Sequence, residues 1–155
     1  MPTAEGTTRQ WFGYAGRVLS TQDLAALEIT GTILEKAYEI CQRERIALVV
    51  VFAPTKFRVY ADICCFEQDS DIQTWTINDL PQRLRDRVHK ISDEIRFFDL
   101  TSPLQDAARD GPLLYYSDDS HWSPEGHAIA ARSISEALRG NFGDRLSELN
   151  DPTTR

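Results

Sequence analysis

The residues best suited to chemistry lie in one short stretch near the C-terminal end of the chain. It reads Tyr-Ser-Asp-Asp-Ser-His-Trp-Ser-Pro-Glu-Gly-His and spans residues 116–127. Asp118 and Asp119 both precede His121 closely. A carboxylate beside an imidazole holds the ring in one tautomer, which leaves the second ring nitrogen free to act as a general base. The spacing therefore predicts an Asp/His pair, and it leaves open which aspartate completes the pair.

A structural role for the same loop is the alternative interpretation. Ser123, Pro124 and Glu125 supply an N-cap, a proline at the first helical position and an acid in the first turn. This pattern predicts a helix that begins directly after the loop. An Asp-Asp-Ser sequence is ordinary at such a helix entry, so the loop alone does not establish catalysis.

A few further residues have side chains that suit substrate binding. Trp122 is expected to form an aromatic wall for a sugar or to anchor the core. Lys56 is expected to bind a substrate carboxylate or phosphate, or to lie in solvent. No three-ligand geometry is evident for His121, Glu125 and His127, so we expect no metal and no cofactor.

The composition restricts the class of protein. A chain of 155 residues is the size of one domain, and 41% hydrophobic residues suffice for a packed core. The formal net charge of -7 and the sequence pI of about 4.9 repel phosphate backbones and anionic lipid surfaces. We therefore expect no nucleic-acid partner.

The compartment is predicted from what the chain contains. The longest apolar run, 46–53, is far shorter than the roughly 20 residues that span a bilayer, and no secretory signal is visible. As written, the chain is expected to be cytoplasmic, whereas an upstream segment would allow a periplasmic or membrane-anchored location. Cys41, Cys64 and Cys65 fit neither a disulfide framework nor a zinc site.

Hydrophobic periodicity and capping residues predict an alternation of helices and strands. Apolar positions at helical spacing, together with caps, predict helices over 22–44, 79–91, 102–109 and 124–139. Short apolar runs predict strands over 46–53, covered on both faces, and over 95–100. Residues 55–77 are expected to form a long loop with one short helix, and 113–116 a short apolar approach to the Asp/His loop.

This order predicts a three-layer α/β/α arrangement around a parallel sheet. We divide the chain into an N-terminal arm over 1–20, a domain over 21–140 and a polar tail over 141–155. Two strands are few for a parallel sheet. A partner or an upstream segment is therefore expected to complete it.

The sequence of the Asp/His stretch resembles the last motif block of the SGNH (GDSL-type) hydrolase superfamily. The form Asp-Asp-Ser-His-Trp-Ser-Pro-Glu-Gly-His is similar to the branch related to alginate O-acetylation proteins. Residues 50–56, Val-Val-Phe-Ala-Pro-Thr-Lys, followed by Val59 and Tyr60, are similar to that branch too. The resemblance covers residues 12–140.

The resemblance implies a flavodoxin-like α/β fold and a serine esterase or O-acyltransferase that acts on small-molecule or carbohydrate esters. The family's general base corresponds to His121. Its aspartate corresponds to Asp118 if the Asp-x-x-His spacing holds, or to Asp119 if the Asp-x-His spacing of the acetylation branch holds.

The nucleophile of the family has no counterpart in this chain. No Gly-Asp-Ser sequence occurs, and Gly143 and Asp144 are followed by Arg145. In the acetylation branch the serine follows the Asp/His block, where this chain has only its polar tail. The chain is therefore interpreted as the C-terminal part of an SGNH domain, with the serine supplied by sequence absent here.

Local substitutes for the missing groups are weak. Ser120 adjoins His121, but neighbouring side chains on an extended loop diverge. Asn78 and Asp79 imitate the family's oxyanion block, although a helix start explains them better. The rival hypotheses are a non-catalytic pseudoenzyme or carbohydrate-binding α/β module, and a small metal-dependent hydrolase.

Overall fold

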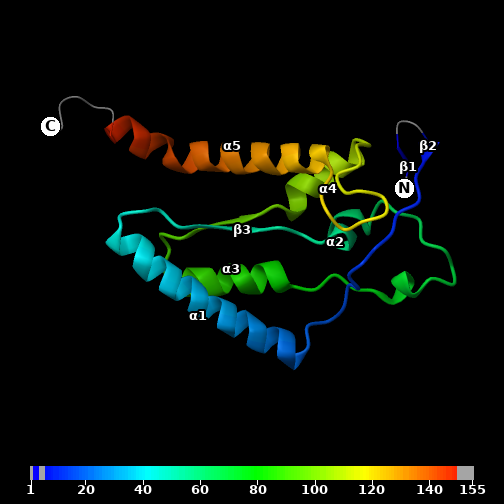
Figure 1. The fold of residues 1–155 in the computed structure, drawn as a ribbon, viewed down its shortest axis with the longest axis horizontal. Helices are drawn as coiled ribbons and strands as arrows, with labels where there is room; N and C mark the ends of the chain where they lie inside the picture. The colour runs from blue at the N-terminus through cyan, green and yellow to red at the C-terminus, as the bar shows by residue number, and fades with distance from the viewer. Residues whose placement is uncertain (1, 4–5, 150–155) are drawn as a thin grey trace.

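The computed structural model describes residues 2–3 and 6–149, with side chains over 8–140. Figure 1 shows helices on both sides of a small central sheet. The layers are α5 (Pro124–Leu149) on one side, β3 (Val49–Phe52) and β4 (Arg96–Asp99) in the middle, and α1 (Thr21–Arg43) with α3 (Leu80–Ile91) on the other. The expected three-layer α/β/α architecture is confirmed.

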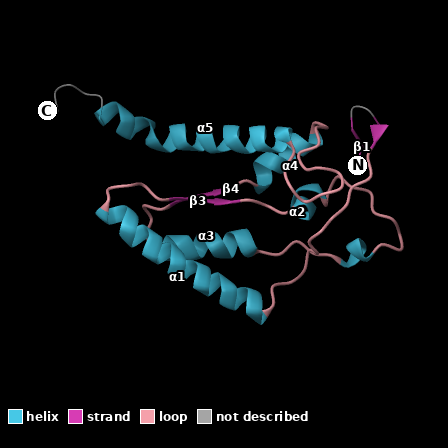
Figure 2. Cartoon of the chain, viewed as in Figure 1, coloured by secondary structure: helices cyan, strands magenta, loops and turns pink. Residues whose placement is uncertain are grey.

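The central sheet consists of two parallel strands among the described residues. β3 pairs with β4 in a register that runs from Val49 opposite Arg96 to Phe52 opposite Asp99, and Figure 2 shows them side by side. A separate antiparallel pair, β1 (Pro2–Thr3) and β2 (Gly6–Thr7), precedes the domain. Both strands expected in the domain are present, each shorter than expected.

Coverage of the sheet differs from the expectation. The apolar run over 46–53 suggested a strand buried on both faces, but Val51 is 36% exposed and Ile46 is 61% exposed. A two-stranded sheet has few neighbours to bury its side chains, which accounts for the difference.

Helix α1 begins at a capping box, one residue before the predicted start of the helix at residue 22. Ser20 accepts a hydrogen bond from Asp23 N at 3.2 Å, and the Asp23 carboxylate accepts from Ser20 N at 2.7 Å. Arg17 pairs with the same carboxylate at 2.6 Å, and this hydrogen-bonded ion pair holds the pKa of Asp23 well below its usual range. Gly31 is buried where α1 meets α3, because Arg87 occupies the space that a Cβ would fill.

Two short helices follow the strands at their carboxyl ends. α2 (Lys56–Tyr60) begins immediately after β3, because Thr55 caps it by accepting from Arg58 N. α4 (Thr101–Arg109) follows β4, and the Asp99 carboxylate accepts from Thr101 N at 2.9 Å. The expected long loop over 55–77 thus begins as a helix and also holds a short 3-10 helix, Asp71–Thr74.

The core lies between α2, α4 and the start of α5. Its fully buried side chains include Tyr60, Leu104 and Tyr115. The Tyr60 hydroxyl accepts from Leu114 N at 2.7 Å, and the Tyr115 hydroxyl donates to Pro54 O at 2.8 Å. These two phenols satisfy buried backbone groups and tie the segment before the Asp/His loop to the end of β3.

The last helix is longer than the sequence predicted. The expected end near Arg139 is wrong, since α5 continues through Gly140 to Leu149. An internal glycine costs a helix only about 1 kcal/mol, and Arg145, Leu146, Glu148 and Leu149 after it are good helix formers. The last six residues of the expected polar tail lie outside the described part of the chain.

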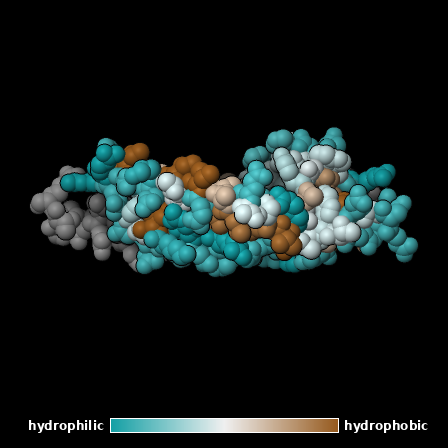
Figure 3. Space-filling model, turned by 90° about the horizontal axis from the view of Figure 1, so that it is seen from below, coloured by the Kyte–Doolittle hydropathy of each residue, from teal (hydrophilic) through white to brown (hydrophobic). Residues whose placement is uncertain are grey.

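Apolar side chains remain on the outer surface of α1. Figure 3 views the molecule from the α1 side and shows brown patches between hydrophilic atoms. Ile29 and Ile33 are each 63% exposed, and Ile40 is 52% exposed. In the described part of the chain, no helix has the length and apolar content needed to cross a membrane.

Candidate active site

The Asp/His stretch forms a tight loop closed by backbone hydrogen bonds. Tyr115 and Trp122 make an isolated antiparallel bridge, and Tyr116 N donates to His121 O at 3.1 Å. Ser123 N donates to Leu114 O at 3.0 Å on the far side of the bridge. Residues 116–121, which we call the dyad loop, are thus held at both ends by the chain itself.

The structure brings Asp119 to His121. The Asp119 Oδ1 and His121 Nδ1 atoms are 2.6 Å apart, and the same oxygen accepts from His121 N at 3.1 Å and from Ser120 N. Hydrogen bonding from His121, chiefly through the ring, lowers the pKa of the Asp119 carboxyl. Asp118 is exposed and lies outside this arrangement, which has the Asp-x-His spacing.

The ring of His121 extends into solvent. Its side chain is 81% exposed, whereas that of Asp119 is 46% exposed. With Nδ1 on the carboxylate, Nε2 is the nitrogen left to face a substrate. The arrangement can take a proton from a hydroxyl group that approaches from outside the loop.

Residues at the start of α5 hold the end of the dyad loop in place. Ser123 is buried, and its Oγ donates to Leu113 O at 2.5 Å while accepting from Gly126 N at 3.2 Å. Gly126 lies so close to Leu114 O that a Cβ would collide with this carbonyl. The predicted Ser-Pro-Glu-Gly helix entry is therefore real, and its glycine is required by close backbone packing.

The buried ammonium group of Lys56 donates to backbone carbonyls of the dyad loop. The residue is 2% exposed, and its Nζ donates to Tyr116 O at 2.7 Å, Ser117 O at 3.1 Å and Asp119 O at 3.1 Å. Burial lowers the pKa of the ammonium group to about 8, against a smaller opposing effect of Cys64 and the two aspartates.

Comparison with known proteins identifies the family. The family model described as "SGNH hydrolase-like domain, acetyltransferase AlgX" matches residues 6–153. The chain belongs to this family. The expected resemblance to the SGNH superfamily, in its alginate acetylation-like branch, is thereby confirmed.

A curated relative points to the same branch as the AlgX family model. The "Probable alginate O-acetylase AlgJ" of Pseudomonas fluorescens is 27% identical over 112 residues. The match covers 72% of this chain and 27% of that relative, so the chain spans little more than a quarter of the relative's length. No solved structure matches the chain.

The two side chains considered for substrate contact in this AlgX-family chain, Lys56 and Trp122, both make contacts within the chain itself. Lys56 was expected at a substrate anion or in solvent, but its three N–H groups are all directed at backbone carbonyls. Trp122 is partly buried against the core, with its ring edge-on to that of His127 at 5.4 Å between centroids. This geometry fits the core-anchor interpretation of Trp122 better than an open sugar-binding wall.

The AlgX-family chain places no nucleophile on the dyad among residues 8–140, whose side chains are described. In this part of the chain, no serine, threonine or cysteine donates to the His121 ring. Asn78, considered for an oxyanion role, already accepts from Arg58 at 2.8 Å and donates to Arg17 O at 2.8 Å. Burial raises the pKa of the Cys64 thiol, which makes it a poor nucleophile.

Metal ligands do not gather around the dyad of this AlgX-family chain. In the described residues, no three His, Cys, Asp or Glu side chains lie close enough together to hold a metal ion. His127 follows Ser123 at the start of α5, where its N–H donates to Ser123 O at 3.0 Å.

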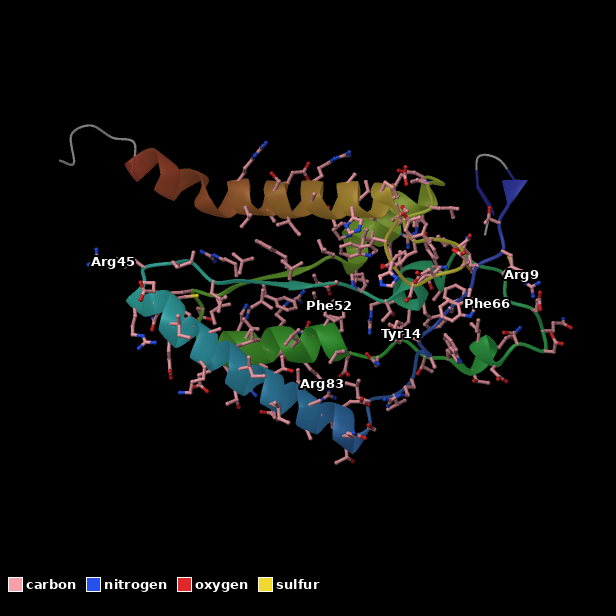
Figure 4. All side chains as sticks on the ribbon, in the orientation of Figure 1. Arg9, Tyr14, Arg45, Phe52, Phe66 and Arg83 are labelled. Atoms are coloured by element: carbon pink, nitrogen blue, oxygen red, sulfur yellow. The ribbon has the colours of Figure 1, made fainter. Side chains whose placement is uncertain are left out.

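Two contacts from the N-terminal arm escaped the sequence analysis. Trp11 N donates to Ser117 O at 2.7 Å, and the Phe12 ring lies with its centroid 5.5 Å from Lys56 Nζ. Figure 4 shows Arg9, Tyr14 and Phe66 in the same region, where the arm passes the dyad loop. The only signal in the sequence was the aromatic cluster at 11–14 in a segment without periodicity.

Proposed function

We propose that this chain carries the Asp/His part of a serine acyl-transfer site that acts on O-acyl esters. Asp119 orients His121, and His121 Nε2 is the general base. The observation that carries the proposal is the 2.6 Å contact between Asp119 Oδ1 and His121 Nδ1 on a ring that is 81% exposed. Membership of the AlgX family supports the same reaction class.

The chemistry proceeds through an acyl-serine ester. A serine hydroxyl attacks the acyl carbonyl of the substrate while its proton passes to His121 Nε2. The tetrahedral intermediate then expels the alcohol, which takes that proton from the imidazolium. An acceptor hydroxyl, or water, attacks the acyl-serine in the second half-reaction, and His121 again takes and returns the proton. The Asp119 carboxylate stabilises the imidazolium in both halves.

The serine is proposed to come from a segment outside residues 1–155. Two observations support this: no serine, threonine or cysteine side chain donates to the His121 ring within residues 8–140, and the central sheet has two strands in the described part of the chain. The partial coverage of the AlgJ relative also leaves ample sequence for such a segment. A segment outside residues 1–155, or a partner, would also complete the sheet.

The proposed substrate class is an O-acetyl ester of a carbohydrate. The relative is a probable alginate O-acetylase, and the family to which the chain belongs is that of the acetyltransferase AlgX.

The deciding experiment uses the whole polypeptide that the gene encodes. Its hydrolysis of p-nitrophenyl acetate and its labelling by a fluorophosphonate are measured for wild type, His121→Gln, Asp119→Asn and Asp118→Asn. We expect the first two variants to lose about 100-fold or more of the rate, the usual contribution of general acid–base catalysis. The matched variant Asp118→Asn should retain wild-type activity.

Equal rates in wild type and His121→Gln would contradict the proposed role of His121. An equal loss in Asp118→Asn and Asp119→Asn would contradict the assignment of Asp119.

The same label applied to the folded 155-residue chain tests the source of the serine. We expect no labelled serine. A single labelled serine, lost in His121→Ala, would place the nucleophile inside the chain and overturn that part of the proposal. Absence of labelling and turnover in the whole polypeptide would favour the rival, a non-catalytic α/β module.

A further inference from the structure

Lys56 is the most enclosed charged side chain of the site, and the proposed reaction does not use it. It lies in the first turn of α2, some 60 residues before the dyad loop in sequence, and it is 2% exposed. Solvent cannot satisfy a charge at this position. The cost of burying an ammonium group has to be met by contacts within the protein.

Three backbone carbonyls of the dyad loop meet that cost. Tyr116 O, Ser117 O and Asp119 O accept from Nζ at 2.7, 3.1 and 3.1 Å. An ammonium group has three N–H donors and no acceptor, so these three contacts use its full capacity. The Phe12 ring, 5.5 Å from Nζ, adds a cation–π contact from the N-terminal arm.

The dyad loop depends on this cation for its conformation. Carbonyl oxygens that converge on one point repel each other and stay together only around a donor that satisfies them all. One of the three carbonyls belongs to Asp119, the residue whose carboxylate holds the His121 ring. The position of the Asp119 backbone therefore sets where the carboxylate, and with it the imidazole, can lie.

We propose that Lys56 is a positioning residue that organises the dyad loop and thereby holds Asp119 against His121. Its importance for turnover rests on the function proposed above, whereas its action on the loop does not. A substrate contact is excluded by the geometry, because every Nζ donor is already directed at the loop.

The charges around Lys56 are consistent with this role. Asp118, Asp119 and Cys64 favour the protonated amine, and burial opposes it more strongly. A neutral amine has two donors, so deprotonation leaves one of the three carbonyls without a partner.

Nuclear magnetic resonance of the folded chain tests the proposal without any ester turnover. The variants are Lys56→Met, Lys56→Arg and the matched control Lys36→Met; the Lys36 side chain is 68% exposed, and its ammonium group pairs with Glu39 at 3.1 Å. The readout is the proton on His121 Nδ1, which is protected from exchange only while Asp119 accepts it. We expect this signal in wild type and Lys36→Met, its loss in Lys56→Met and its partial retention in Lys56→Arg.

If Lys56→Met does not fold, a pH titration of the wild-type chain tests the proposal instead. The carbonyl carbons of Tyr116, Ser117 and Asp119 should shift together with the Nζ of Lys56 as pH rises through about 8. Carbonyl shifts without that common midpoint, or an unchanged His121 Nδ1 proton in folded Lys56→Met, would overturn the proposal. Loss of the Nδ1 proton in Lys56→Met, together with no ester turnover by the wild-type whole polypeptide, would instead count against the proposed function alone.

Discussion

One oxygen of Asp119 accepts from three donors that lie within the next two residues. These donors are Ser120 N, His121 N and His121 Nδ1. A short side chain at a turn commonly accepts from the backbone just after it, and here the same geometry also captures the imidazole. The Asp119 carboxylate, which contacts the His121 ring, is therefore positioned by local backbone structure as well as by the loop around it.

Replacement of the imidazole should change how Asp119 titrates. We expect His121→Gln to raise the pKa of the Asp119 carboxyl toward its ordinary value, because the ring is the main cause of the lowered pKa. Carbon-detected titration of the carboxyl resonances measures the change. His127→Gln, which alters a histidine outside the dyad, should leave the Asp119 titration unaltered, and an equal shift in both variants would contradict the assignment.

The lowered pKa has a definite effect on stability. A carboxyl whose pKa is lower in the folded state stabilises the fold above its unfolded pKa and loses that effect as pH falls through the folded pKa. In the wild-type chain, the free energy of unfolding should fall as pH drops below about 4, the usual titration range of an aspartate. In His121→Gln this fall should be smaller.

The dyad residues and Lys56 show how much of the site could be predicted from the sequence at the residue scale. The Asp/His pair was predictable, because both partners lie within one short motif. The choice of Asp119 over Asp118 was not, because it depends on turn geometry. The position of Lys56 was predictable only in part: its place after a strand was clear, but the carbonyls that it binds are distant in sequence.

At the scale of elements, α1 and α3 meet at a contact between Gly31 and the Arg87 side chain. A Cβ on Gly31 would meet the Arg87 side chain, which is 18% exposed and pairs with Glu28 at 3.4 Å. The glycine costs helix propensity, yet it allows the two helices to approach.

Two glycines inside helices make a matched pair for testing this contact. We expect Gly31→Ala to lower the free energy of unfolding by about 1 kcal/mol, since overpacking costs more than the gain in helix propensity. Gly140→Ala, with no atom within 4 Å of the new Cβ, should raise it by up to about 1 kcal/mol. Urea unfolding measures both, and a stabilising Gly31→Ala would show that Arg87 moves freely.

The existence of most elements could be predicted, and their ends less well. The helices over 22–44 and 79–91 were clear because their apolar positions repeat at helical spacing. The immediate start of α2 was missed because Thr55 was not recognised as a cap. The extension of α5 beyond Gly140 was missed because one glycine was given too much weight.

The whole molecule combines a net negative charge with unburied apolar surface. The formal charge is -7 at pH 7, while Ile29, Ile33 and Ile40 lie exposed along α1. Like charge keeps copies apart at neutral pH, and this repulsion vanishes near the pI of about 4.9.

The number of strands in the described sheet could be predicted, whereas the exposure of Val51 depends on which neighbours a strand has.

Association should therefore increase as pH falls from 7 toward 5. Light scattering at several protein concentrations measures it, and we expect Ile33→Glu to reduce it. Gln22→Glu adds the same charge away from the three isoleucines and should reduce it less. Scattering that stays flat over this pH range would contradict the expectation.

The long sequence separation between Lys56 and the dyad loop also determines when the site can form. The contact of Asp119 with His121 spans two residues, so any compact turn can make it early in folding. The three contacts of Lys56 each close a loop of 60 residues or more, and closing such a loop costs chain entropy before it yields any bond. On refolding, His121 should contact Asp119 first. Its ring should become rigid only when Lys56 binds the carbonyls of the dyad loop.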